Sequence, residues 1–170
     1  MEYICVRSKR KTVSISINPS GEVIVRAPVR LSGNEIDKFV KKNIEWINKQ
    51  RNKQQRYLDV YPELTNEQTA VFKETAQTYL PLRTAYFAEI MELFPNSVKI
   101  TSAKKRFGSC SANNNICFSY MLMRYPQRAI DYVIVHELSH IKYKNHSKEF
   151  YKTVESILPD YKDRRKLFSP

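Results

Sequence analysis

Residues 131–146 read DYVIVHELSHIKYKNH, and this stretch decides which architecture the rest of the chain must support. It contains the pattern His-Glu-x-x-His at His136, Glu137 and His140. Two residues four positions apart project from the same face of a helix. Apolar side chains recur at helical spacing on another face of the same segment, namely Ile130, Val133, Ile134, Leu138 and Ile141. The spacing predicts a helix that is buried on one side and presents two imidazoles on another.

Two imidazoles on one helix face are suited to binding zinc. Zn²⁺ prefers neutral imidazole nitrogens at about 2.0–2.1 Å in a tetrahedral arrangement, and a catalytic site keeps one position open. Glu137 projects about 100° round the helix from His136, beside such a metal and not onto it. Its carboxylate could take a proton from a metal-bound water, whose pKa the metal lowers toward ~7. The pattern therefore predicts a zinc-dependent hydrolase with Glu137 as the general base.

A third zinc ligand is expected from His146, the last of the chain's three histidines. If the helix continued beyond His140, His146 would lie about 240° away and point elsewhere. A turn at Lys144-Asn145 is expected, because Asn tolerates the left-handed conformation that ends helices. Ser147 is the expected N-cap of the next helix. A carboxylate from that helix is the alternative third ligand, either Glu149 or Glu155.

The first part of the chain predicts a β-hairpin followed by a helix. Residues 12–18 alternate between apolar and polar, which is typical of a half-buried strand. A turn at 18–21 and a second strand at 23–25 complete the hairpin. Ser32 and Glu35 have capping-box spacing, and apolar residues behind them predict a helix over about 33–55.

The remainder alternates helical and extended patterns. Residues 66–93 predict helix, with a break or kink at Pro81. Two strands are expected at 98–102 and 116–122, on either side of a polar loop at 104–112. Pro126 suits the first turn of the histidine-bearing helix, and a last helix is expected over about 147–158. We expect an α+β fold in one domain of residues 1–170, composed of a hairpin and helix (1–56), a helical connection (57–95) and a zinc-site core (96–170).

Composition limits the remaining classes of function. The net charge is +12, and the positive excess lies in residues 1–60 and 101–170. Such a charge can attract nucleic acid, but no nucleic-acid motif accompanies it, which favours a basic solvated surface. No apolar run approaches the ~20 residues of a membrane helix, and no signal-peptide pattern begins the chain, so a cytoplasmic protein is expected. Three cysteines without a Cys-x-x-Cys pair argue against a disulfide framework or a zinc ribbon.

Several motifs resemble the YgjP-like metallopeptidase domain family. The resemblance is strong over about 98–167 and weaker over 7–50. It is carried by the histidine motif, by Asn145-His146-Ser147-Lys148-Glu149-Phe150 and by the segment Leu158 to Lys166. Lys105-Arg106-Phe107-Gly108-Ser109-Cys110-Ser111 is similar to the family's Arg-Trp-Gly-Ser-Cys-Ser motif, with Phe107 in place of Trp. Residues 57–95 depart from the family pattern, because they are helical and interrupted by proline where the family has a strand-forming stretch.

The resemblance implies a compact zincin with a hairpin, helices and a small sheet beside the helix that carries His-Glu-x-x-His. It implies His136, His140 and His146 as zinc ligands, Glu137 as general base, and a peptide or protein as substrate. The strand at 116–122, if it is a sheet edge, could pair with an extended substrate. Arg106, Tyr143 and Tyr161 are candidates to stabilise an oxyanion. The alternative is a basic nucleic-acid-associated or protein-binding domain whose zinc site is not catalytic.

Overall fold

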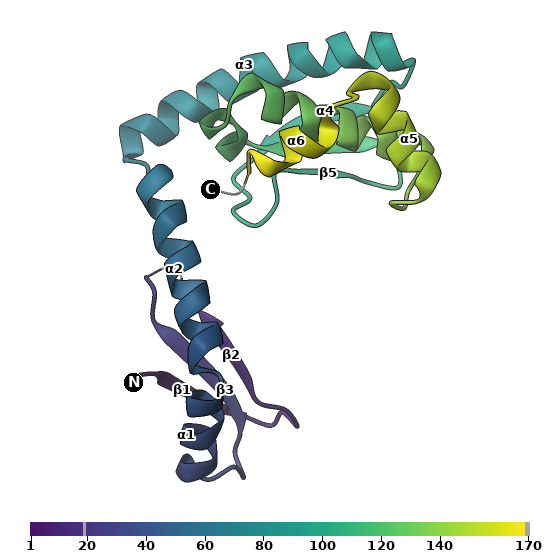
Figure 1. Cartoon of the computed structure of the whole chain (residues 1–170). Coiled ribbons are helices and arrows are strands. Elements are labelled where there is room, and N and C mark those ends of the chain that lie inside the picture. The colour runs from purple at the N-terminus through teal and green to yellow at the C-terminus, as the bar shows by residue number, and fades with distance from the viewer. Residues whose placement is uncertain (19, 169–170) are drawn as a thin grey trace. The chain divides into compact units, whose positions relative to one another are not determined.

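Two three-stranded sheets, each with its own helices, make up the computed structural model, which describes residues 1–18 and 20–168 (Figure 1). The chain divides into two compact units, Met1–Pro62 (unit 1) and Glu63–Pro170 (unit 2). The mixture of helices and small sheets confirms the predicted α+β class. No helix in the described ranges is both long and apolar enough to cross a membrane. The expectation that residues 1–170 form one domain stays a prediction.

The sheet of unit 1 contains the predicted hairpin and one strand that the sequence did not reveal. β2 (Ser14–Ile17) pairs antiparallel with β3 (Val23–Pro28), as expected. In the turn between them, Gly21 N–H donates to the carbonyl of Asn18 at 3.0 Å; Pro19 lies outside the described residues. β1 (Ile4–Ser8) pairs parallel with β3, so the order is β1-β3-β2. All five residues of β1 are exposed, which explains why no alternation marked it.

The expected helix over 33–55 is two helices in the structure. The first, α1 (Gly33–Lys42), begins at the predicted capping box of Ser32 and Glu35. It ends at Asn43, whose side chain donates to the Phe39 carbonyl at 2.8 Å and so competes with continued helical hydrogen bonding. The second, α2 (Ile44–Val60), extends into the segment expected to be a connection. The core of unit 1 joins the sheet to both helices through Val23, Val25, Ala27, Ile36, Val40 and Ile47.

Unit 2 opens with α3 (Asn66–Met91), which continues through Pro81 where a break or kink was expected. Its capping box consists of Thr65 and Gln68, and it ends where Glu92 adopts a left-handed conformation with φ of 53°. Ala76, Leu80, Phe87 and Ala88 of this helix are buried in the core of unit 2. Tyr86 and Ile90 of the same helix are 52% and 49% exposed.

The sheet of unit 2 has the order β4-β6-β5. β4 (Ser97–Thr101) and β6 (Asn115–Ser119) are the two expected strands and run parallel. β5 (Gly108–Cys110) lies inside the segment expected to be a loop and pairs antiparallel with β6. The expected strand at 116–122 is therefore central in the sheet, not an edge, and η1 (Tyr120–Arg124), a 3₁₀ helix, takes over its last residues. The edge strand that packs beside the histidine-bearing helix is β5.

Three C-terminal helices complete unit 2. α4 (Gln127–Lys142) carries the histidine motif and packs its predicted apolar face into the core. α5 (Lys148–Ile157) begins at the predicted N-cap, where Ser147 Oγ accepts from Phe150 N–H at 3.3 Å. α6 (Tyr161–Lys166) was not expected from the sequence. Its six residues are too few for a clear apolar period, so its position depends on contacts with α4.

Candidate metal centre

α4 presents two of the three histidines from one face. The His136 and His140 ring centroids lie 4.9 Å apart, as expected for neighbours one turn apart. Phe150 of α5 packs against both imidazoles, with centroid distances of 4.8 and 4.5 Å. The Phe150 side chain is fully buried. A rigid apolar ring behind the two imidazoles therefore fixes their positions from the core side.

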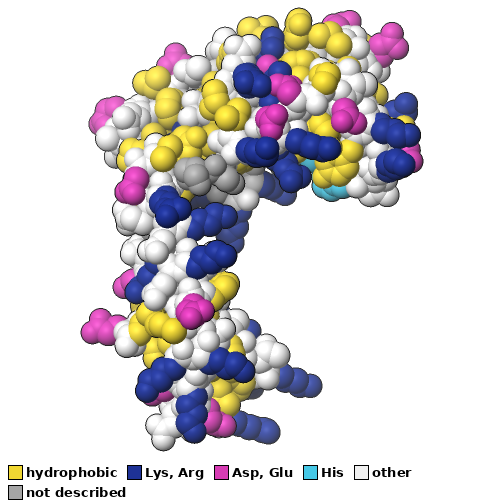
Figure 2. Space-filling model, viewed as in Figure 1, with side chains coloured by type: hydrophobic (Ala, Val, Ile, Leu, Met, Phe, Trp, Pro, Cys, Tyr) yellow, Lys and Arg dark blue, Asp and Glu magenta, His cyan; other side chains and the backbone are white. Residues whose placement is uncertain are grey.

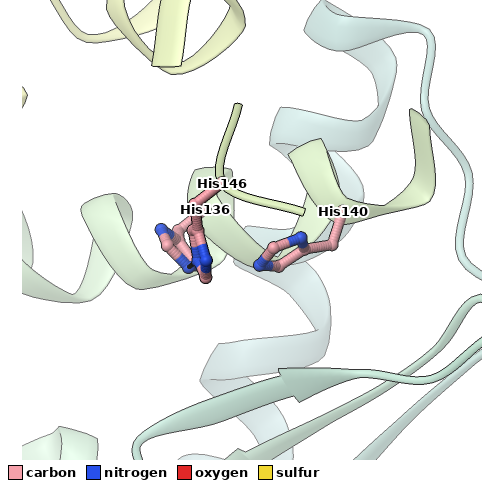
Figure 3. Close-up of side chains that lie close together, drawn as sticks. All are labelled: His136, His140 and His146. Atoms are coloured by element: carbon pink, nitrogen blue, oxygen red, sulfur yellow. Dashed lines mark hydrogen bonds between the residues drawn. The ribbon is translucent and has the colours of Figure 1, made fainter. Parts of the chain in front are cut away.

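His146 joins them from the segment between α4 and α5 (Figure 3). Its Nε2 lies 3.0 Å from Nε2 of His136, and one nitrogen of each of the three histidines lies within 4.8 Å of the others. In the described part of the chain, neither Glu149 nor Glu155 belongs to this group. His146 thus lies beside His140 and His136, which precede it by six and ten residues. The function of the three histidines as metal ligands stays a prediction.

The turn that brings His146 back lies at the expected place but has a different backbone conformation. α4 is followed by Tyr143, which has extended backbone angles, φ −124° and ψ 105°. The chain bends at Lys144 and Asn145, as expected. Asn145 is not among the described residues with positive φ, so the left-handed conformation expected there is wrong. The Tyr143 carbonyl accepts a hydrogen bond from His140 Nδ1 at 2.9 Å. This bond reverses the chain and fixes the His140 tautomer, because a protonated Nδ1 leaves Nε2 as the ligand nitrogen.

Two of the three imidazoles, those of His136 and His140, have pKa values lowered in the direction that metal binding requires. Burial lowers the pKa of His136 to about 3, with smaller contributions from His140 and His146, so this ring is neutral at ordinary pH. Burial also lowers the pKa of His140. His136 Nδ1 is buried and has no hydrogen-bond partner among the described residues. Ligand nitrogens around tetrahedral zinc lie roughly 3.3 Å apart, close to the observed separation of His136 and His146. The donor set therefore fits zinc.

Glu137 lies beside this cluster in a confined position. Its side chain is only 6% exposed, and burial raises its pKa to about 7, opposed in part by the charge of Arg106. Gly108 of β5 lies directly against it: a Cβ on Gly108 would be 2.6 Å from Glu137 Oε1 and 2.7 Å from its Cγ. Only glycine leaves space for the carboxylate at this position. A carboxyl group with a pKa near neutrality is suited to proton transfer at ordinary pH.

A cavity of about 400 Å³ adjoins Glu137 and His136. Its lining adds residues that the sequence did not single out for the site: Gly108, Tyr132, Val133, Arg165 and Phe168, next to Phe107 of the family-like motif. Tyr132 precedes His136 by four residues, and their ring centroids lie 5.7 Å apart. That spacing alone could have identified Tyr132. Arg165 and Phe168 come from α6 and the residues after it, and only the tertiary structure brings them here.

The three expected oxyanion-stabilising residues are placed differently from one another. Tyr161 is buried, and its ring stacks on those of Tyr132 and Tyr151 at 6.5 and 5.8 Å. Tyr143 uses its carbonyl to hold His140, while its ring contacts the Lys142 ammonium. Arg106 is exposed and close enough for its charge to act on Glu137. Of the three, Arg106 is the one whose charge acts on the carboxyl group of Glu137.

The family described as YgjP-like, metallopeptidase domain, matches residues 11–72 and 63–169, nearly the whole chain. The chain belongs to the YgjP-like metallopeptidase domain family. This match confirms the resemblance found in the sequence. The match also spans residues 57–95, which were expected to depart from the family pattern.

One solved structure similar to the chain is the metallopeptidase zymogen of Pyrococcus abyssi abylysin. The two share 21% sequence identity with a TM-score of 0.45, over 51% of this chain and 91% of that one. A search of the curated proteins found no match.

Proposed function

We propose that this member of the YgjP-like family is a zinc-dependent peptidase whose metal is held by His136, His140 and His146. One observation carries the proposal: a nitrogen from each of three imidazoles meets within 4.8 Å, beside a buried carboxyl group whose pKa is about 7. The described residues supply only these three side chains to the group, which leaves a coordination position for water. A structural zinc site, in contrast, is closed by four protein ligands.

When bound, zinc would supply a Lewis acid that polarises a carbonyl and lowers the pKa of a coordinated water. The chain's own contribution is to move the proton. Glu137 accepts a proton from the attacking water and donates it to the leaving amine. Burial favours this exchange, because it raises the pKa of the Glu137 carboxyl toward neutrality. The fixed His140 tautomer keeps the ligand nitrogen directed at the metal during this exchange.

The position of β5 supports a peptide as substrate. β5 is an edge strand, and its Gly108 touches the general base. An extended peptide that pairs with β5 would pass beside Glu137, and main-chain hydrogen bonds would bind it without regard to side chains. Tyr132 and Arg165 line the adjoining cavity and can donate hydrogen bonds to a substrate carbonyl there. We assign the oxyanion contact to this pair.

The experiment compares Glu137→Gln with the wild type for bound zinc and for hydrolysis of unfolded protein substrates. We expect one zinc per chain in both, and hydrolysis reduced on the order of 10³-fold or more in the variant, because the general base is lost. Glu149→Gln, an exposed carboxylate outside the histidine group, is the matched control and should retain full activity. A wild type without zinc, or a variant with unchanged hydrolysis, would contradict the proposal.

A further inference from the structure

Unit 1 contains a basic cavity that the peptidase site does not use. β1 and β3 run parallel and end together, with Ser8 opposite Pro28 in the register. The carboxyl ends of these neighbouring strands therefore open at the same edge of the sheet. A cavity of about 600 Å³ lies there, between the residues that follow β1 and those that follow β3. The two segments supply four cations to its lining: Lys9, Arg10, Lys11 and Arg30.

None of these four cations forms a salt bridge within the described ranges 1–18 and 20–168. The guanidinium of Arg10 donates from Nη2 to Thr12 Oγ1 at 3.4 Å, whereas its Nε is buried and has no partner among the described atoms. A buried donor without a partner costs free energy, and an anion in the cavity would satisfy it. The positive charge of these four side chains is thus uncompensated at one place on unit 1. Further Lys and Arg side chains are spread over the viewed face of unit 1 (Figure 2).

The walls of this cavity are held in place independently of those four cations. Arg7 Nη1 donates to the carbonyls of Val29 and Leu31 at 3.1 and 2.5 Å. Val29 N–H in turn donates to the Ser8 carbonyl at 3.2 Å. One arginine therefore fixes the turn after β3 against the end of β1, and the neighbouring cations remain available for a ligand.

We propose that this cavity binds the phosphate groups of a nucleic-acid backbone. Of the described lining residues, none is acidic and none is aromatic, so the site can attract phosphates but offers no ring on which a base could stack. Recognition is therefore independent of base sequence. Lysine and arginine on two adjacent segments can contact successive phosphates of one strand. Inorganic polyphosphate also presents successive phosphate groups, so the experiment must distinguish it from nucleic acid as the ligand.

The test measures binding of the full chain to a fluorescent single-stranded RNA by anisotropy at several salt concentrations. The variant Lys9→Gln/Lys11→Gln/Arg30→Gln should bind the RNA on the order of tenfold more weakly than the wild type does. Its slope of log K against log salt should be smaller by about two, since three phosphate contacts are lost at ~0.7 each. The control Lys49→Gln/Lys53→Gln/Arg56→Gln removes the same charge from exposed positions of α2 that do not line the cavity.

The control decides between a site and general attraction to a basic protein. Equal weakening in both variants, or no salt-dependent binding by the wild type, would overturn the proposal. Unlabelled RNA and tripolyphosphate are compared as competitors of the fluorescent RNA at equal phosphate concentration. If the RNA competes better, nucleic acid is the source of the phosphate groups that the cavity binds. Preference for tripolyphosphate would overturn that assignment. Removal of metal with a chelator should leave RNA binding unchanged, so this result does not depend on whether the chain is a peptidase.

Discussion

At the scale of single residues, the contact between Gly108 and Glu137 constrains the candidate site most tightly. The edge strand approaches the carboxyl group so closely that no side chain fits between them. This contact explains why a glycine follows Phe107 in the family-like motif, although local spacing alone suggests no function for that glycine. The glycine thereby places β5, the strand that we propose to bind substrate, against the proposed general base.

Gly108→Ala should impair hydrolysis without removing the metal. The added Cβ would lie 2.6 Å from Glu137 Oε1, so the carboxylate must move. A displacement on this scale lowers hydrolysis by on the order of 10²-fold, because proton transfer depends on geometry. Bound zinc, measured by metal analysis, should stay at the wild-type level. Gly33→Ala is the control, since its Cβ would meet nothing within 4 Å, and equal activity in the two variants would disprove the steric argument.

Burial of neutral His136 makes the metal-free protein sensitive to acid. The pKa of this imidazole falls from an ordinary 6.5 to about 3 in the folded chain. Between these values the unfolded chain binds more protons, so the stabilisation is complete above pH 6.5 and is lost as pH falls toward 3. Denaturant unfolding of the metal-free protein should therefore show stability falling across this range. His136→Gln should flatten that dependence, and an identical pH profile in the variant would contradict the assignment.

At the scale of elements, a buried ion-pair group connects α3, α4 and α6. Asp131 of α4 is 6% exposed and accepts two hydrogen bonds from Arg83 of α3, at 2.7 and 3.0 Å. Arg164 of α6 lies 3.6 Å from the same carboxylate. Because α6 positions Arg165 at the cavity, this group indirectly shapes the candidate site. The short α6 is placed by this ion pair and by aromatic stacking of Tyr161.

Asp131→Ala should destabilise unit 2 strongly. The substitution leaves Arg83 without its buried partner, whereas Arg164 keeps its pair with Asp160 at 2.7 Å. Loss of one member of a buried ion pair costs about 3–5 kcal/mol. Thermal or denaturant unfolding measures the change. Asp163→Ala is the control, because its pair with Lys166 is exposed on both sides and contributes less than about 1 kcal/mol. Comparable losses in the two variants would show that the Asp131 group is not a structural centre.

At the scale of the whole molecule, the two activities that we propose belong to separate units. Each unit has its own hydrophobic core, and each core lies entirely within its unit. The histidine cluster and Glu137 lie in unit 2, where histidine (cyan) is visible at the surface in Figure 2. The basic cavity lies in unit 1. A chain with this division could hold a polyanion with one unit and hydrolyse a peptide with the other.

A fragment of residues 63–170 should fold and bind one zinc ion. It retains the whole larger core and all three histidines. Circular dichroism and metal analysis would check both points, and RNA binding by the fragment should be lost. A fragment that stays unfolded would instead favour the expectation of a single domain over residues 1–170, in which unit 1 is needed for stability.

The sequence alone determined the features that depend on local spacing. Helical periodicity and the four-residue separation placed His136 and His140 on one face of a helix, and the capping box of Ser32 and Glu35 marked where α1 begins. Strict alternation identified β2, and the motifs identified the family. These predictions succeeded because each depends on residues within a few turns of one another.

Features that depend on contacts between distant segments could not be predicted from local spacing. β1 is exposed and β5 is three residues long, so neither has a period that marks it, and each exists because a neighbouring strand pairs with it. The turn to His146 uses the His140 imidazole and not a left-handed Asn145 backbone. The elevated pKa of Glu137 and the need for glycine at 108 both follow from burial of the carboxyl group against an edge strand. Burial depends on what packs around a residue, which local sequence spacing does not specify.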